Sequence, residues 1–239
     1  MDKMIILLFT QQAFNSITLT INSKVRKETL DTLVAGNLSV DGGVYFNNNY
    51  WHFNRNIGDS SLKGKFEYLK ILYSNTAKFG LEISEASQDP LSNKADKLCQ
   101  SALQRLGRLS HAWQDYYAHA VAISYKKGDP DKDTGIISPS SNPYFPDPNM
   151  KPSSYGKGGG EHGSVTAWNA LNGKYEPGNR APDKAARRTR SVTFTAEMFG
   201  IMLPLWHEAC KCTPTVRYWE LPPANYKPIP YWKLKSGGL

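Results

Sequence analysis

The feature that most constrains the fold is the segment 92–122, which contains no proline and repeats apolar residues at helical spacing. Steps of three and four residues place these positions on one face of a helix. Ser92 or Asn93 is expected to cap its start. A helix of this length is typical of the central member of a bundle. The apolar positions are Leu98, Ala102, Leu106, Leu109, Trp113 and Tyr117.

The remaining segments predict a mainly α chain, a helical bundle around this long central helix. Pro204 is expected to kink or end the late helix. Polar segments rich in Gly, Asn, Pro or Ser predict long loops, and the end of the chain is expected to be extended. Helices are expected over 20–35, 63–80, 164–172 and from Asp183, loops over 36–61 and 126–163, and the tail from Thr213.

No repeat or linker divides the chain, so we expect a single domain over residues 1–239. Its core is predicted over about residues 15–212, and residues 213–239 form a Pro- and aromatic-rich tail. Hydrophobic residues at 40% and charged residues at 21% are ordinary for a globular protein and exclude a disordered chain.

The net charge of +8 favours an anionic partner. Nucleic acid, a phospholipid surface and an acidic neutralising protein all fit this charge. A basic surface that serves solubility is the alternative. The charge therefore bears on attraction and leaves the fold open.

Three cysteines are present, Cys99, Cys210 and Cys212. Cys99 lies in the amphipathic segment and is expected to be a small buried residue. The odd count argues against a disulfide framework, and the isolated C-x-C pair does not predict a zinc knuckle. The short apolar run at the start does not predict a signal peptide, and no run reaches the length of a membrane span.

The chemistry-bearing residues of the central helix are His111, Asp115 and His119. Residues four apart on a helix differ by about 40° and rise about 6 Å, so neighbouring members of this set share a face. Imidazole and carboxylate are suitable zinc ligands, which predicts that His111 and Asp115 bind one metal ion. His119 can bind the same ion, bind a second ion or donate a proton. Three polar residues in a buried hydrogen-bond network are the alternative.

One helix cannot complete a coordination sphere, so further ligands must come from the loops. Asp41, His52 and His162 are the candidates, and glycines on both sides of the Glu161–His162 pair allow close approach to a site. Glu161 is a candidate base for activating a water molecule. Loop His and Asp residues that are merely solvated are the alternative for each.

Four basic residues begin the late helix, and a solvated helical face is the simpler interpretation of them. Attraction of phosphate or lipid headgroups is the functional alternative, which salt dependence would distinguish. His207, near Pro204, is expected to be structural. The basic residues are Lys184, Arg187, Arg188 and Arg190.

Residues 106–119, LGRLSHAWQDYYAH, resemble the helical signature of the zinc-dependent phospholipase C and single-strand nuclease superfamily. The closest likeness is to its fungal heterokaryon-incompatibility branch. The segment 36–41 and the Trp51-His52-Phe53 element resemble that branch's Asp and His-Phe elements. Similar domains, with a Glu-His-Gly element like residues 161–163, are found at the C-terminal ends of bacterial Rhs-type polymorphic toxins.

The resemblance implies an α-helical bundle, zinc and hydrolysis of a phosphoester. By matching of residues it implies that Asp41, His52, His111 and Asp115 are metal ligands, joined by His119 and His162. Members with three zinc ions also use an early histidine and a late His-x-x-x-acid pair. Here no histidine precedes His52 and Thr166 follows His162 by four, so one or two ions are expected.

The leading hypothesis is a phospholipase C-like antibacterial toxin, secreted or delivered into a target cell by a specialised secretion system. His119 or Glu161 would be its catalytic proton carrier. Phospholipid membrane is the expected substrate, and a cognate immunity protein and a parent Rhs shell are the implied partners. A metal-dependent nuclease with the same site is the second hypothesis. A non-enzymatic helical toxin or binding module is the third, and a nucleic-acid-binding protein driven by charge alone lacks a recognised motif.

Overall fold

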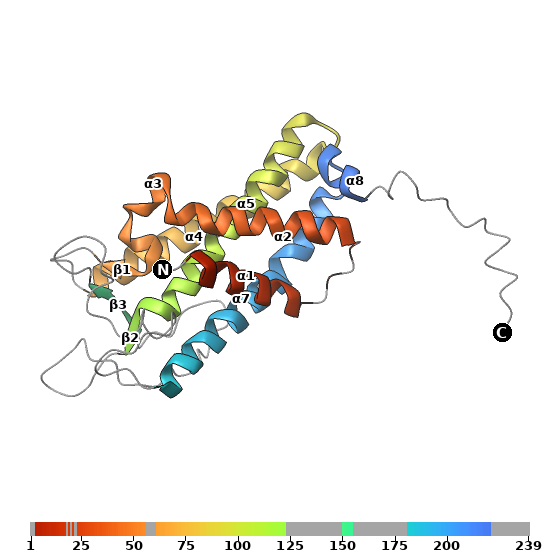
Figure 1. Cartoon of the computed structure of the whole chain (residues 1–239). Coiled ribbons are helices and arrows are strands. Elements are labelled where there is room, and N and C mark those ends of the chain that lie inside the picture. Colours follow the sequence, from red (N-terminus) through yellow and green to blue (C-terminus); the bar gives the residue numbers. More distant parts are fainter. Residues whose placement is uncertain are drawn as a thin grey trace, which may run out of the picture.

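The computed structural model of the chain describes residues 3–17, 19, 21, 23–55, 61–122, 150–154 and 181–220. This part is mainly α-helical, which confirms the predicted fold class (Figure 1). The helices are α1 (Lys3–Ser16), α2 (Ser23–Leu38), η1 (Ser39–Asp41), α3 (Gly43–Phe46), η2 (Asn49–His52), α4 (Ser61–Gln88), α5 (Asn93–His119), α7 (Ala181–Cys210) and α8 (Pro214–Glu220), and the short strands are β1 (Asn54–Arg55), β2 (Ala120–Ala122) and β3 (Met150–Ser154).

Helix α5 is the centre of the structure, because α2, α4 and α7 all pack against it (Figure 1). Ser92 caps its start: its Oγ accepts a hydrogen bond of 3.1 Å from the amide of Ala95. The predicted apolar stripe is buried where its side chains are described, apart from the half-buried Leu98. Packing on several sides also buries residues outside that stripe. The buried positions of the stripe are Ala102, Leu106, Leu109 and Trp113, and those outside it include Leu103, Ala112 and Tyr116.

Helices α2 and α5 cross with their backbones in close contact at two glycines. A Cβ atom on Gly107 would lie 2.3 Å from the carbonyl oxygen of Leu33, and one on Gly36 would lie 2.3 Å from the carbonyl oxygen of Gln104. Real side chains do not tolerate such distances, so the crossing requires glycine on both helices. This crossing brings the end of α2 against the middle of α5.

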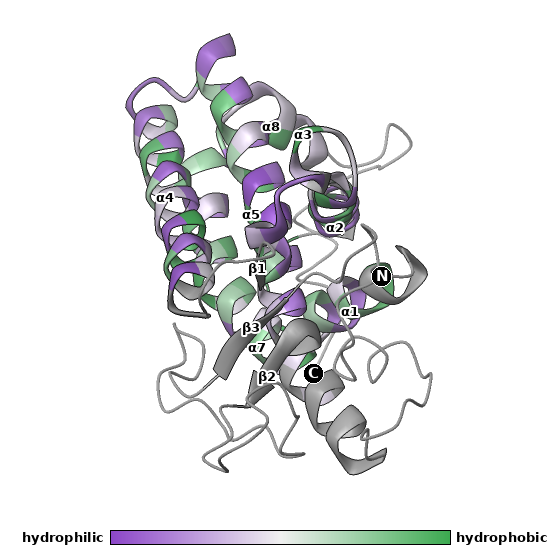
Figure 2. Ribbon diagram, turned by 90° about the vertical axis from the view of Figure 1, so that its left-hand side faces the viewer, coloured by the Kyte–Doolittle hydropathy of each residue, from purple (hydrophilic) through white to green (hydrophobic). Residues whose placement is uncertain are grey.

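Helix α4 begins close to the predicted 63–80 segment but continues to Gln88. Phe66 is 63% exposed, whereas Tyr68, Leu72 and Phe79 are buried. Aromatic side chains therefore stand on both the exposed and the buried side of this helix. In Figure 2, hydrophilic and hydrophobic residues alternate along α4, as expected for a helix with one buried face.

The prediction that the core begins near residue 15 is wrong, because α1 contributes to it. Phe9, Ala13 and Phe14 are buried, and α1 packs against α2 and α7. Their spacing of four and five residues places them on one side of the helix. Two glutamines after the opening apolar run obscured this pattern in the sequence.

Pro204 does not end α7, which continues to Cys210. The proline is exposed, while Leu203 and Trp206 beside it are buried. The Trp206 indole also donates a hydrogen bond of 2.9 Å to the carbonyl of Cys99 on α5. Packing therefore keeps the helix continuous at Pro204, where the proline cannot donate a backbone hydrogen bond.

A disulfide joins Cys99 of α5 to Cys210 at the end of α7, which overturns the expectation drawn from the odd cysteine count. The two residues are separated by 111 positions in the chain, and their Cα atoms lie 5.9 Å apart. An odd count is equally compatible with one bridge and one free thiol. Cys212 is that exposed free cysteine within the described part of the chain.

The tail is not extended from Thr213, because α8 follows immediately. Asp96 of α5 accepts hydrogen bonds from the amide and the hydroxyl of Thr215, at 2.8 and 2.7 Å. Val216 and Trp219 are buried. A residue remote in sequence thus caps this helix, and no local sequence pattern predicts such a cap.

The segment 36–61, predicted as a loop, contains the short helices η1, α3 and η2 and the strand β1. β1 pairs in parallel with β3, and β2 pairs antiparallel with β3 at the end of α5. Most of the predicted 126–163 loop, the 164–172 helix and the tail beyond residue 220 lie outside the described residues. Among the described helices, none has both the length and the apolar character needed to cross a bilayer.

Candidate metal centre

The first two residues of the centre, His111 and Asp115, stand one turn apart on α5. Both are almost completely buried, with exposed fractions of 0% and 1%. The distance from His111 Nε2 to Asp115 Oδ2 is 2.9 Å. The helix spacing therefore brings an imidazole and a carboxylate together, as the sequence predicts.

The other two residues, Asp41 and His52, come from the connection between α2 and α4. Asp41 ends η1, which follows α2 directly, and His52 ends η2. Asn48 caps η2, because its Oδ1 accepts a hydrogen bond of 3.1 Å from the amide of Tyr50. Two short helices thus present a carboxylate and an imidazole to the same part of α5.

Phe53 fixes the end of η2 and with it the position of His52. Its φ of 50° is in the left-handed region, an unfavourable conformation for a residue other than glycine. The ring is buried and packs against Tyr68 and Tyr116, with both pairs of ring centroids 4.6 Å apart. Tyr68 in turn donates a hydrogen bond of 2.9 Å to the carbonyl of Ala112 on α5. Aromatic packing therefore holds a strained backbone next to the centre.

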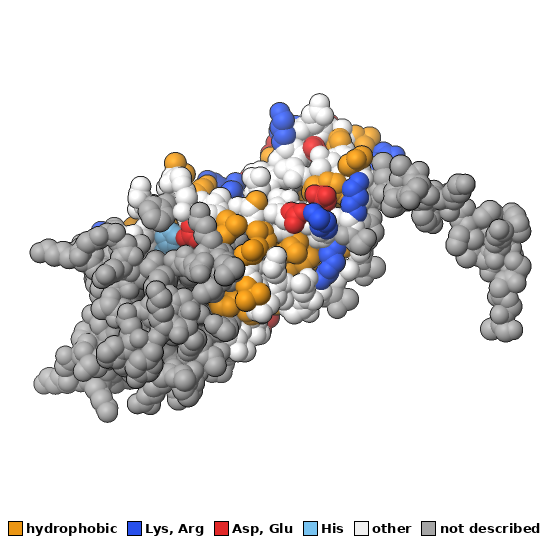
Figure 3. All heavy atoms as spheres, in the orientation of Figure 1, with side chains coloured by type: hydrophobic (Ala, Val, Ile, Leu, Met, Phe, Trp, Pro, Cys, Tyr) orange, Lys and Arg blue, Asp and Glu red, His pale blue; other side chains and the backbone are white. Residues whose placement is uncertain are grey.

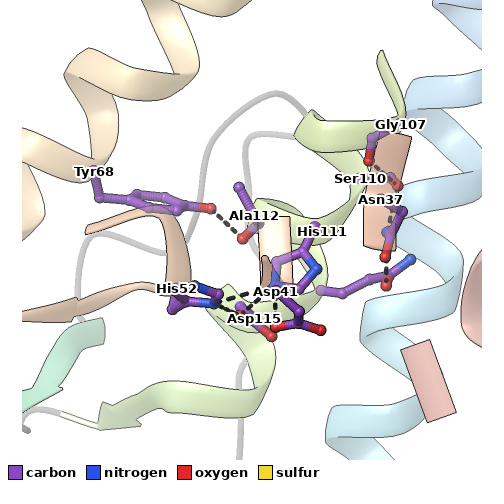
Figure 4. Close-up of polar contacts among 10 residues, drawn as sticks. Asn37, Asp41, His52, Tyr68, Gly107, Ser110, His111, Ala112 and Asp115 are labelled. Atoms are coloured by element: carbon purple, nitrogen blue, oxygen red, sulfur yellow. Dashed lines mark hydrogen bonds and ion pairs between the residues drawn. The ribbon is translucent and has the colours of Figure 1, made fainter. Parts of the chain in front are cut away.

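The four side chains converge in a small volume (Figure 4). His52 Nδ1 lies 2.8 Å from Asp115 Oδ2 and 3.2 Å from His111 Nε2. His111 Nε2 lies 3.6 Å from Asp41 Oδ1. One ligand atom from each of Asp41, His52 and His111 can be chosen so that all three lie within 4.8 Å of one another.

These distances fit the requirements of a metal ion. In a tetrahedral site with bonds of about 2.0–2.1 Å, neighbouring ligand atoms lie about 3.3 Å apart. The separation of 3.2 Å between the His52 and His111 nitrogens is close to this value. Both nitrogens face the same carboxylate oxygen, so a cation between them would be held by two imidazoles and a carboxylate.

The centre is electrostatically unbalanced without a cation. Burial lowers the pKa of His111, but the charge and hydrogen bond of Asp115, together with the charge of Asp41, outweigh it and raise that pKa above its ordinary value. The buried atoms without a hydrogen-bond partner in the described part of the chain include three of this centre, Asp41 Oδ2, His52 Nε2 and His111 Nδ1. Such atoms are costly, but they are not the atoms that converge; a metal ion held by the converging atoms would supply positive charge opposite the two carboxylates.

A polar network on the other side of α5 holds that helix against α1 and α2. The Asn37 amide donates to Ser110 Oγ at 2.7 Å and to Gln114 Oε1 at 3.3 Å. Gln114 donates to Thr10 Oγ1 of α1 at 3.1 Å. Ser110 and Gln114 directly precede His111 and Asp115, so this buried network orients the part of α5 that carries the centre. This network was not predicted from the sequence, although Asn37 stands four residues before Asp41.

Three predicted site residues cannot be placed. The side chain of His119, the last residue of α5, lies outside the described residues, as do Glu161 and His162 entirely. The side chains of the basic group Lys184, Arg187, Arg188 and Arg190 also lie outside them. His207 lies in the last turn of α7 beside Trp206, where a basic residue complements the helix dipole.

The centre lies close to the molecular surface. In Figure 3 a histidine and an acidic side chain are visible next to each other on one face. Of the four residues, Asp41 is the most accessible, with a side-chain exposure of 12%. Comparisons with protein-family models, with characterised proteins and with solved structures found no match to this chain.

Proposed function

We propose that this chain is a metal-dependent phosphoester hydrolase whose metal ligands are Asp41, His52, His111 and Asp115. The observation that carries the proposal is the convergence of four donor atoms from two distant segments: His111 Nε2 lies 2.9 to 3.6 Å from a donor atom of each of the other three residues. Two histidines and two carboxylates suit zinc, which fits the resemblance of residues 106–119.

The bound ion would supply Lewis-acid chemistry, lowering the pKa of a water molecule from about 15.7 towards about 7 and stabilising charge on phosphoryl oxygens. The protein's own task is to hold the ligands in place. Asp115 contacts both imidazole nitrogens and fixes the orientation of the two rings. Asp41 adds a second negative charge at the more accessible side of the centre.

His119 and Glu161 are the proposed proton carriers. His119 follows Asp115 by one further turn of α5, so its backbone is close to the centre. An imidazole there is suited to protonate a leaving oxygen. His162 is proposed as an additional ligand on the strength of the resemblance alone, which would allow one or two ions.

The proposed substrate is a phospholipid headgroup ester, and cleavage of nucleic acid is the second candidate. The net charge of +8 supports an anionic polymer or surface in either case. Both substrates contain a phosphodiester, so a single metal site serves either reaction. Only their size and shape distinguish them.

Delivery outside the producing cell is part of the proposal. A disulfide between α5 and α7 is typical of proteins that work in oxidising compartments, which supports secretion or delivery as a toxin. A basic toxin would be neutralised by an acidic immunity protein. An Rhs shell as the parent polypeptide is proposed from the resemblance alone.

The test is hydrolysis by the full chain, supplied with zinc, of anionic liposomes and of single-stranded DNA. Product release from one substrate, abolished by chelator and by Asp115→Asn, is the expected result. His207→Ala, on α7, is the matched control and should retain activity. Membrane leakage that persists in chelator would favour the non-enzymatic alternative, and absence of cleavage of both substrates by the zinc-loaded chain would refute the proposal.

A further inference from the structure

Arg108 stands on α5 one turn before His111, on the stripe that carries the candidate metal centre. Side chains three residues apart on a helix are neighbours, with Cβ atoms about 5–6 Å apart. Asp115 lies two turns further along the same stripe. A cationic group is therefore fixed beside the proposed metal ligands.

Among the described residues this arginine has no hydrogen-bonded or ion-paired acid, although the charge of Glu82 acts on it from further away. Its one recorded contact there is with the ring of Tyr45, whose centroid lies 5.5 Å from the guanidinium carbon. Its Nε is buried and has no hydrogen-bond partner in the described part of the chain. A half-buried guanidinium in this state has lost hydration without gaining a direct hydrogen bond to a carboxylate.

The neighbouring Arg105 shows what a satisfied arginine looks like on the same helix. It donates two hydrogen bonds to the Glu82 carboxylate, at 2.6 and 3.0 Å, and a third to Asn75 at 2.9 Å. The Glu82 carboxylate is thus already hydrogen-bonded to Arg105. The positive charge of Arg105 also acts on Arg108. Burial lowers the pKa of Arg108 below its ordinary value and the charge of Arg105 adds to this, while Tyr45 and Glu82 act in the opposite direction.

We infer that Arg108, beside the metal centre, binds the phosphoryl group of an anionic substrate. The inference rests on the proposed function for the identity of the substrate. That no described acid is hydrogen-bonded or ion-paired to the Arg108 guanidinium is an independent observation. The planar guanidinium forms two parallel hydrogen bonds with a phosphate, which a lysine cannot match. The Tyr45 ring, supported by Trp51 at a centroid distance of 5.3 Å, restricts where that guanidinium can go.

Tyr45 and Trp51 belong to the same connection that supplies Asp41 and His52. The segment between α2 and α4 therefore contributes both metal ligands and the aromatic support for Arg108. A phosphate held by Arg108 would lie within reach of the metal centre, since residues at this spacing on a helix are neighbours. Arg108 would then orient the substrate and balance charge on its phosphoryl oxygens.

The test is titration of the full, disulfide-bonded chain with inorganic phosphate, by calorimetry, in zinc-loaded and chelated forms. Arg108→Gln should raise the dissociation constant about tenfold or more, because hydrogen bonds to charged groups are worth about 1.5–3 kcal/mol. Arg108→Lys should raise it less. Arg217→Gln on α8 removes the same charge from an exposed position and should leave phosphate binding unchanged.

The outcomes separate this inference from the proposed function. Arg108-dependent phosphate binding in the chelated chain, with no zinc binding, would support the anion site and refute the metal hydrolase. Zinc binding with equal phosphate affinity in the wild type and Arg108→Gln would refute the anion site alone. Absence of phosphate binding to the wild type in both forms would also overturn it. Thermal unfolding of each variant establishes that it is folded, and Arg108→Lys, which retains the aliphatic stem and the charge, is decisive if the glutamine variant unfolds.

Discussion

Replacement of Gly107 by alanine tests how the centre is assembled. The new methyl group would lie 2.3 Å from the carbonyl oxygen of Leu33, 3.0 Å from the amide of Asn37 and 3.0 Å from Cα of Gly36. All three are backbone atoms of α2, so a side-chain rotation cannot relieve the clash. Helix α2 must move away from α5 by roughly 1 Å, given that ordinary carbon contacts need about 3.5 Å.

The free energy of unfolding should fall by about 1–3 kcal/mol, the usual cost of overpacking. This loss exceeds the gain of about 1 kcal/mol that alanine brings over glycine in a helix. Movement of α2 would also displace Asp41, which follows it directly, and weaken metal binding. Chemical denaturation with and without zinc measures both effects.

Gly80→Ala is the matched control. Gly80 lies within α4, is exposed and has nothing within 4 Å of the position its Cβ would take. Its replacement should therefore stabilise the fold by about 0.5–1 kcal/mol and leave zinc affinity unchanged. A Gly107→Ala variant as stable as the wild type and with unchanged zinc affinity would refute the close crossing of α2 and α5.

Two further predictions concern stability. Reduction of the Cys99–Cys210 disulfide, or its replacement by alanines, should lower the free energy of unfolding by about 3–5 kcal/mol, because the bridge closes a long loop; equal melting curves with and without reductant would contradict this. Glu82→Gln should cost about 1 kcal/mol at neutral pH, since solvent screens a partly exposed ion pair with Arg105. Burial raises the pKa of Glu82, but the hydrogen bonds and charge of Arg105 outweigh this and hold it below its ordinary value. The stabilisation by the Glu82–Arg105 pair is therefore fully present above the ordinary glutamate pKa and is lost as the pH falls through the lowered pKa. The free energies of unfolding of the wild type and Glu82→Gln should converge in acid, which denaturation at several pH values measures.

The parts of the fold that were predicted correctly are those encoded within one helix. The apolar stripe of 92–122 and the cap at Ser92 are local patterns, and both are found in α5. Two of the errors concern contacts between distant segments. Asp96 caps α8 from far away in sequence, and Cys99 pairs with Cys210 only because α5 and α7 meet. Neither contact can be predicted from the spacing of residues within one segment.

The same distinction applies to the centre. His111 and Asp115 could be paired from their spacing, since both lie on α5. Asp41 and His52 were candidate ligands from the loops, which the resemblance also implied, and what brings them to α5 is the glycine crossing together with the packing of Phe53. The sequence indicates the residue types of the centre, whereas the distances between their side chains depend on the tertiary structure.

Metal analysis of the purified full chain tests the central claim most directly. After incubation with zinc and removal of unbound ions, the wild type and His207→Ala should retain at least one ion per chain. His111→Ala and Asp115→Asn should lose it while remaining folded, because each removes a ligand from the buried set. A wild-type chain that retains no metal, or variants that retain as much as the wild type, would contradict the account.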